Sequence, residues 1–211
     1  MKFFSSLVVA ALLVSSVSFA GNDSYKQSSS KVDYSKIDEA FDRLKDVGVD
    51  LQPTGTICEY LAKETIERKF SPDQFEIVLG IQYGEFKNAV GELDVTVIDR
   101  EFSQVVYVAE VKCWKNPASG LKKAKEQLSR FMNYLNGRRV NWMKILAPGY
   151  DSLHVESADF QNQFDVGYIA QKGSRKSGYT TELDFTLREA MKLRARIMEC
   201  QDAGECKRPA N

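Results

Sequence analysis

The sequence has very little histidine and no closely spaced pair of cysteines. His154 is the only histidine among 211 residues, and no Cys-x-x-Cys occurs. A hydrolytic site built on paired histidines is therefore unsupported, and a serine triad would have to use this one residue. His154 lies in a polar stretch and is interpreted as a surface residue. Zinc binding or a catalytic thiol is the weaker interpretation of the cysteines, because that spacing is absent and Cys113 points away from Lys112 in a strand.

Long apolar runs are also scarce, and only the first stands out. Leu7–Val14 is unbroken and follows the basic start Met1-Lys2, and Ser18-Phe19-Ala20 resembles a small-x-small cleavage site. These features predict a secretory signal peptide over residues 1–20, too short to span a bilayer, with an uncleaved anchor as the alternative. No later segment is long and apolar enough to cross a membrane. We therefore expect a periplasmic or secreted protein that has no membrane association after cleavage.

Export changes how the cysteines are interpreted. An oxidising compartment would allow the four cysteines to form two disulfides. Four cysteines allow three pairings, and the sequence does not choose among them. Cys200 and Cys206 flank a short glycine-containing loop and are the easiest pair to close, which would leave Cys58 with Cys113.

Neither sign of charge is in excess, since 29 Lys and Arg residues balance 29 Asp and Glu residues. This balance gives no global argument for nucleic-acid binding. The cations nevertheless concentrate after Lys112, where Glu126 is the one acid among them. A solvated helix face is the simplest alternative explanation of this block. A second basic stretch, Lys172–Gly178, predicts a Gly/Ser-rich loop. The cations of the first block are Lys115, Lys122, Lys123, Lys125, Arg130, Arg138 and Arg139.

Hydrophobic periodicity predicts an α/β protein in which helices cover a mixed sheet. Residues 21–34, rich in Ser, Asn and Gln, predict a flexible tether, and residues 35–211 predict a single domain. Ser35 is expected to cap the first helix. Three consecutive strands with short connections predict an antiparallel meander. The expected helices are 35–48, 56–70, 117–136 and 181–200, and the expected strands are 75–83, 93–98, 105–114, 140–147 and 164–171.

Two of these strands carry charges that are costly to bury unless they are paired or bind a metal. Glu92 and Asp94 share one face of their strand, as do Glu110 and Lys112, because side chains alternate. If Asp94 and Glu110 meet across the strand pair, their oxygens suit Mg²⁺ or Mn²⁺, together with the backbone carbonyl of Val111. The alternative is a set of ordinary cross-strand ion pairs in which Lys112 neutralises Glu110 or Asp94.

The residues Gly91-Glu92-Leu93-Asp94, followed one strand later by Glu110-Val111-Lys112, resemble the motif of the PD-(D/E)xK nuclease superfamily. The resemblance implies a restriction-endonuclease-like core, metal binding by Asp94 and Glu110, and a catalytic role for Lys112. It covers roughly residues 56–148, in the family's order of helix, three-stranded meander, helix and strand. The proline before the family's aspartate is missing here, so that half of the motif carries no weight.

The resemblance points to two further positions. A glutamate on the helix before the meander often joins the metal site through water in this family, and Glu59 is the candidate. A capping box formed by Thr56 and Glu59 is the alternative. On the helix after the meander, Gln127 is a candidate hydrogen-bonding residue of the site, with simple packing as the alternative. Some members have a tyrosine four residues after this glutamine, where this chain has Phe131, so the motif is incomplete. Glu92 is either a supporting acid or a strand-edge residue facing water.

We therefore expect an exported, metal-dependent nuclease of low sequence specificity, which hydrolyses phosphodiester bonds in DNA rather than RNA. The competing hypothesis is a catalytically silent nucleic-acid-binding or interaction protein on the same scaffold. The intact acidic and basic residues argue against a silent site, which would be free to lose them. Contacts to nucleic-acid phosphates are expected from Lys115, Lys122, Lys123 and Arg130.

Overall fold

The computed structural model describes residues 31–160 and 163–209, and its contacts divide the chain between Lys31 and Val32. The helices and strands described below belong to the second unit, Val32–Asn211. The expected signal peptide at 1–20 and most of the expected tether at 21–34 lie outside the described residues.

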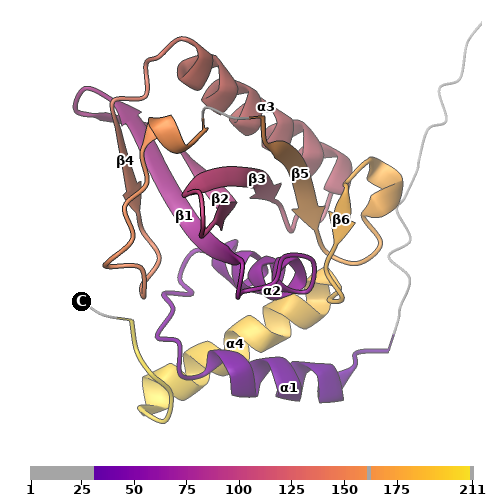
Figure 1. The fold of residues 1–211 in the computed structure, drawn as a ribbon. Coiled ribbons are helices and arrows are strands. Elements are labelled where there is room, and N and C mark those ends of the chain that lie inside the picture. The colour runs from indigo at the N-terminus through magenta and orange to yellow at the C-terminus, as the bar shows by residue number, and fades with distance from the viewer. Residues whose placement is uncertain (1–30, 161–162, 210–211) are drawn as a thin grey trace, which may run out of the picture. The chain divides into compact units, whose positions relative to one another are not determined.

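A six-stranded mixed sheet forms the centre of this unit (Figure 1). Across the sheet the strand order is β4-β1-β2-β3-β5-β6. β1, β2 and β3 form the expected antiparallel meander, β4 pairs antiparallel with β1, and β5 and β6 extend the other edge in parallel. The α/β class expected from the sequence is therefore confirmed. The strands are β1 (Phe75–Glu85), β2 (Asn88–Asp99), β3 (Gln104–Val111), β4 (Trp142–Ile145), β5 (Asp165–Ala170) and β6 (Thr181–Glu182).

Helices flank the two faces of the sheet (Figure 1). α3 (Pro117–Asn136) packs against β2, β3 and β5, whereas α2 (Thr56–Glu67) packs against β1, β2 and β3. α4 (Leu187–Ala203) contacts α2, and α1 (Tyr34–Leu44) contacts α4. Two large apolar cores result, one on the α2 side of the sheet and one on the α3 side. Strands buried on both faces explain why the central segments read as almost continuous apolar runs.

The alternation of side chains breaks at one level of β1 and β2. Leu79 packs in the α2 core and Ile81 in the α3 core, although residues two apart in a strand normally share a face. Gly80 between them has a φ of +64°, in the left-handed region that favours glycine. β2 shows the same change of face. The residue after Asp94 pairs with Leu79 and packs in the α2 core, whereas the residue before Asp94 pairs with Ile81 and packs in the α3 core. Asp94 therefore lies at the level of the sheet where the alternation of side chains between the two faces is broken.

The first two helix starts differ from those expected. Asp33, rather than Ser35, caps α1, and its side chain accepts a hydrogen bond from a backbone N–H three residues later. Both residue types are good caps, so sequence alone separates them poorly. α2 has Gly55 at its N-cap with no side-chain cap, so the capping box expected as an alternative for Thr56 and Glu59 is wrong. Both helices end a few residues earlier than expected, α1 before residue 48 and α2 before residue 70.

The C-terminal part also corrects the sequence-based expectation. The segment expected to begin a helix, Thr181–Glu182, is the short strand β6. α4 begins later, after Thr186, whose side chain accepts from the Glu189 N–H while the Glu189 carboxylate accepts from the Thr186 N–H. This capping box satisfies two N–H groups that a helix start otherwise leaves unpaired. The strands expected at 140–147 and 164–171 are present but shorter, as β4 and β5.

Two disulfides join Cys58 to Cys113 and Cys200 to Cys206, the pairing that follows if the short C-terminal loop closes first. Disulfides of this kind are compatible with an extracellular or periplasmic protein. None of the helices in residues 31–160 and 163–209 is long and apolar enough to span a bilayer.

We expect the two disulfides to contribute unequally to the free energy of unfolding. Cys58–Cys113 closes a sequence separation of 55 residues, against 6 for Cys200–Cys206. Chain-entropy estimates give about 4 kcal/mol for the longer loop and about 2 kcal/mol for the shorter. In urea unfolding, the double variant Cys58→Ala/Cys113→Ala should therefore lose about 2 kcal/mol more than Cys200→Ala/Cys206→Ala. Equal losses, or four free thiols in the mass of the unreduced protein, would contradict this ranking.

Candidate active site

The charged residues of β2 and β3 converge at one end of the sheet. The ammonium Nζ of Lys112 lies 2.7 Å from Asp94 Oδ2 and 3.2 Å from Glu110 Oε2. The same Asp94 oxygen accepts a 2.7 Å hydrogen bond from the backbone N–H of Val111. Asp94 is 6% exposed and Glu110 is 0% exposed, so both carboxyl groups are buried. The structure thus brings together the three residues that the sequence motif singled out.

The chain around Lys112 is held by β5 and by the start of α3. The Lys112 N–H donates to the Ile169 carbonyl at 2.9 Å, and the Tyr179 hydroxyl lies 3.5 Å from the Lys112 carbonyl. Gly120, in the first turns of α3, allows this close approach. A Cβ at that position would lie 2.6 Å from Tyr179 Oη and 3.4 Å from Lys112 Cβ. A larger residue there would displace the end of β3 or the tyrosine.

Glu59 reaches the same cluster from the first turn of α2. Burial raises the pKa of Glu59 to about 8, and the charges of Asp94 and Glu92 add to this effect, against the opposing effect of Lys112. Its carboxyl group therefore belongs to the same electrostatic cluster. The capping box, the alternative role considered for Glu59, is absent. A role for Glu59 in the site stays a prediction.

The other charged groups influence one another strongly. Burial and the charge of Asp94 raise the pKa of Glu110 to about 8, and Lys112 partly offsets them. Burial, with a further contribution from Asp94, also raises the pKa of Glu92. Burial alone would lower the pKa of Lys112, but Asp94 and Glu110 outweigh it, so the pKa of Lys112 is raised. Lys112 stays charged, while the carboxyl groups of Glu92 and Glu110 hold protons more tightly than usual.

Acids outnumber bases in this cluster, which simple cross-strand ion pairs do not explain. The single ammonium of Lys112 is shared by Asp94 and Glu110. The charges of Asp94 and Lys112 also act on Glu59 and Glu92. Oε1 of Glu110 is buried and has no hydrogen-bond partner among the described residues. Buried carboxylate oxygens in excess of positive charge are the donor set that a hard divalent cation prefers.

The arrangement of the acidic side chains bears on whether they could hold a metal ion. Within residues 31–160 and 163–209, no three Asp, Glu, His or Cys side chains are grouped tightly enough to hold an ion as they stand. The ammonium of Lys112 supplies the positive charge between Asp94 and Glu110. The donor types, the unpaired Glu110 oxygen and the surplus of carboxyl groups nevertheless fit Mg²⁺ or Mn²⁺ chemically.

The remaining candidates lie on or beside α3. Gln127 is half-buried next to the buried Leu128, and its side chain makes no hydrogen bond to a described residue, so packing stays an open explanation. Arg130 Nη1 donates to the Val90 carbonyl of β2 at 3.2 Å, which ties this cation to the strand that carries Asp94. The other expected phosphate contacts are exposed, and they are Lys115, Lys122 and Lys123.

One residue beside Lys112 did not stand out in the sequence. Trp114 is 43% exposed, and its carbonyl accepts a 2.7 Å hydrogen bond from Nε2 of Gln171. A tryptophan at the end of an apolar strand predicts burial, so its exposure becomes visible only in the structure. The basic loop Lys172–Gly178, recognisable in the sequence, begins directly after Gln171.

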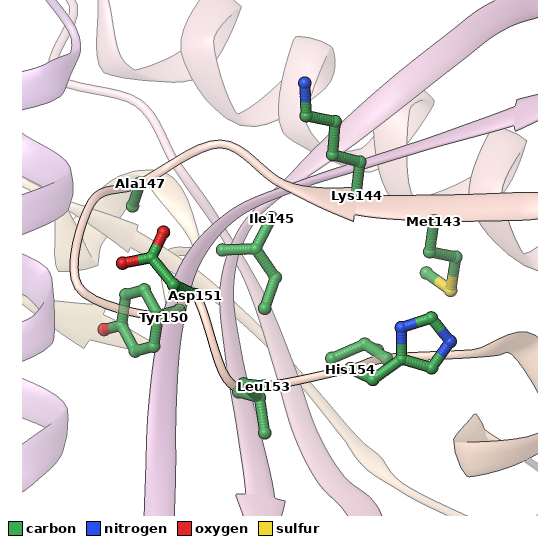
Figure 2. Close-up of a pocket in the computed structure, with 9 residues that line it drawn as sticks. Met143, Lys144, Ile145, Ala147, Tyr150, Asp151, Leu153 and His154 are labelled. Atoms are coloured by element: carbon green, nitrogen blue, oxygen red, sulfur yellow. The ribbon is translucent and has the colours of Figure 1, made fainter.

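A cavity of about 230 Å³ lies beside the edge strand β4, and the residues of the acidic cluster are not among those that line it. Figure 2 shows Lys144, Asp151 and His154 among its lining side chains. The His154 side chain is 81% exposed and lies 3.1 Å from a carboxylate oxygen of Glu156. This agrees with the surface position expected for the histidine, and the cavity brings no catalytic group to Asp94 or Glu110.

We expect the stability of the metal-free protein to fall as pH rises from about 4.5 to about 8. In this window the folded state keeps protons on Glu59 and Glu110 that the unfolded state, with ordinary carboxyl pKa values, has released. Each group contributes a slope of at most about 1.4 kcal/mol per pH unit. Glu110→Gln should flatten the dependence of the melting temperature on pH, measured in EDTA between pH 5 and 8.

Glu85 provides a matched control for this titration. Its hydrogen bonds to Arg139 lower the pKa of Glu85, so it titrates below this window. Glu85→Gln should therefore leave the slope between pH 5 and 8 unchanged. A flat profile for the unaltered protein, or an equal slope after Glu110→Gln, would contradict the buried-carboxyl explanation.

Comparison of the chain with models of known protein families, with curated proteins and with solved structures finds no match. The functional argument therefore depends on the geometry and chemistry of the cluster formed by Glu59, Glu92, Asp94, Glu110 and Lys112.

Proposed function

We propose that the chain is a metal-dependent nuclease of the PD-(D/E)xK type, which hydrolyses phosphodiester bonds in DNA outside the cytoplasm. The observation that carries the proposal is the convergence of Asp94, Glu110 and Lys112 at one end of the sheet, with carboxyl groups in excess of positive charge. A structural ion pair needs one acid for one base, whereas hydrolysis at a phosphate needs oxygen ligands and a cation together.

The arrangement of elements supports a restriction-endonuclease-like core. α2 precedes the antiparallel meander β1-β2-β3, which is followed by α3 and then by strands at both edges of the sheet. Asp94 lies on the second strand of the meander and Glu110 and Lys112 at the end of the third. These are the positions that the motif assigns to the acids and to the lysine.

Each side chain has a role that its surroundings can support. Asp94 and Glu110, with the backbone carbonyl of Val111, would hold Mg²⁺ or Mn²⁺, and Glu59 would join them through water. When bound, such an ion lowers the pKa of water and stabilises negative charge on a phosphoryl group. The ammonium of Lys112, held between two acids, is placed to stabilise negative charge that develops at the phosphate.

Glu59 adds a group that can exchange a proton near neutral pH. Burial raises the pKa of Glu59 to about 8, within reach of the near-neutral range in which an acid or base group exchanges protons efficiently. Arg130, fixed to Val90 of β2, and the exposed Lys123, nearer the start of α3, provide positive charge for the substrate backbone. These cations explain substrate binding without sequence specificity, because phosphates carry no base identity.

We expect the purified mature protein to cleave DNA only when Mg²⁺ or Mn²⁺ is added. Lys112→Ala and the isosteric Asp94→Asn should each reduce the cleavage rate by about 10²–10³-fold, the usual loss when one charge-stabilising group is removed. Linear, circular and single-stranded DNA, and RNA, should be compared with and without the metal. Lys87→Ala, which removes an exposed lysine from the β1–β2 turn, is the charge control and should cleave normally.

Two results would count against the nuclease. Metal-dependent cleavage that survives both Lys112→Ala and Asp94→Asn unchanged would place the reaction elsewhere. Binding of DNA without cleavage under any of these conditions would instead favour the silent nucleic-acid-binding protein. Asp94→Asn keeps an acceptor for the Val111 N–H, so its folding, checked by circular dichroism, should be preserved.

We also expect the metal to stabilise the fold more at pH 8 than at pH 6. Protons compete with the ion for Glu110 and Glu59 at the lower pH, because the pKa of each is raised to about 8. A site filled at 100 times its dissociation constant gains about 2.7 kcal/mol, which corresponds to roughly 5–10 °C in melting temperature. Thermal melts with Mg²⁺, Mn²⁺ or EDTA measure this difference. An equal gain in Glu110→Gln would show that the ion binds elsewhere.

A further inference from the structure

Trp114 is an exposed aromatic residue directly beside the proposed catalytic lysine. Its side chain is 43% exposed, although it follows a strand whose last residues are buried. A Cβ built at Gly120 would lie 3.4 Å from Lys112 Cβ and 3.4 Å from Trp114 Cβ. The Cβ atoms of Lys112 and Trp114 therefore lie within about 6.8 Å of each other, twice the 3.4 Å distance. The exposed Trp114 therefore branches from the backbone close to Lys112, whose ammonium contacts Asp94 and Glu110.

The backbone that carries this indole is fixed. The Trp114 carbonyl accepts a 2.7 Å hydrogen bond from Nε2 of Gln171, which is only 6% exposed. At the other side, the first turns of α3 begin immediately after Asn116, whose side chain caps the helix. An exposed ring on a fixed backbone offers a flat surface whose ordering cost is small when a ligand stacks on it.

Basic residues lie next to Trp114 in the chain and in the segment that begins at its hydrogen-bond partner Gln171. Lys115 follows Trp114 in the chain, and the segment from Gln171 to Thr181 contains cations but no acid. That segment packs against α3, since a Cβ at Gly178 would lie 3.1 Å from Leu121 Cδ2. In Figure 1 the short helix of this segment and the start of α3 lie on the same side of β5 and β6. The exposed cations here are Lys115, Lys122, Lys172 and Arg175.

An exposed aromatic face among cations suits one class of ligand in particular. Phosphates of any nucleic acid are attracted by the lysines and the arginine, but in a duplex each base already stacks on its neighbours. Only an unpaired base can offer its face to an indole. Stacking of this kind contributes about 5- to 150-fold per base to affinity, depending on the site, and does not depend on base identity.

We propose that Trp114, with the cations named above, binds an unpaired nucleotide next to the phosphate to be cleaved, so that single-stranded segments and frayed ends are the preferred substrates. This proposal rests on the proposed nuclease function and specifies its substrate class. An open groove of about 500 Å³ on α3 prolongs the surface, because Leu121 and Lys122 belong to both. Lys125 also lines this groove, and its ammonium lies 5.9 Å from the centre of the Tyr168 ring.

Binding is tested without divalent metal, so that cleavage does not intervene. Labelled single-stranded and duplex oligonucleotides of equal length are titrated in EDTA. Trp114→Ala should weaken single-strand binding roughly 5- to 150-fold and leave duplex binding nearly unchanged, whereas Trp114→Phe should retain most of the affinity. Phe102→Ala is the matched control, since Phe102 is 66% exposed in the β2–β3 turn at the far end of β3 from Lys112.

Fluorescence gives a second measurement at the residue itself. The chain has two tryptophans, so Trp142→Phe leaves Trp114 as the reporter. Single-stranded DNA should quench its emission, and duplex DNA should not. If Trp142→Phe fails to fold, the same quenching should be present in the unaltered protein and absent in Trp114→Ala.

The outcomes separate this proposal from the nuclease itself. Metal-dependent cleavage with equal single-strand affinity in Trp114→Ala and no quenching would overturn the stacking proposal and leave the nuclease intact. Loss of single-strand affinity in Trp114→Ala without any cleavage would support the stacking surface and count against the nuclease. An equal loss of single-strand and duplex affinity would show that Trp114 supports the surface without selecting unpaired bases.

Discussion

The shared ammonium of Lys112 is the interaction on which the acidic cluster depends. Asp94 and Glu110 are buried side by side, and the ammonium of Lys112 partly offsets the rise that burial and Asp94 cause in the pKa of Glu110. Removing one partner of a buried ion pair typically costs roughly 3–5 kcal/mol, whereas an exposed pair contributes about 1 kcal/mol or less. A fold that only needed stability would be better served by apolar residues at these positions. This cost supports the proposal that the cluster serves a function rather than the stability of the fold.

The exchange of faces at Gly80 explains how acids from both sides of the sheet come together. Glu59 approaches from α2. On the α3 side, burial raises the pKa of Tyr83 and of Tyr168, and Glu110 adds a smaller contribution to both. A regular sheet would separate these two groups by its own thickness. Because β1 and β2 change faces at one level, Asp94 stands between the two sides and interacts with both. The local break in alternation is thus part of the construction of the site.

Much of the central architecture could be predicted from local patterns, and the errors have local causes. The meander follows from short runs rich in Val, Ile, Thr and Tyr, and α3 follows from a clear helical stripe. Asp94, Glu110 and Lys112 follow from a short motif, and the fold brings these three residues together. The same Thr-x-x-Glu pattern occurs at two helix starts, but only the one at Thr186 forms a capping box, because α2 already begins with Gly55 at its N-cap. β6, only two residues long, owes its existence to pairing with β5, which no local pattern encodes. The exposure of Trp114 likewise depends on tertiary packing.

The disulfide between Cys58 and Cys113 links the stability of the fold to the geometry of the site. Cys58 precedes Glu59 and Cys113 follows Lys112, so the covalent loop begins and ends at residues of the cluster and encloses Asp94 and Glu110. Ionised carboxyl groups buried next to one another repel, and a covalent link between α2 and the end of β3 opposes the separation of these elements. An oxidising compartment would thereby hold the cluster together even when no metal balances its charge. In this sense the proposed export of the protein and the proposed chemistry depend on each other.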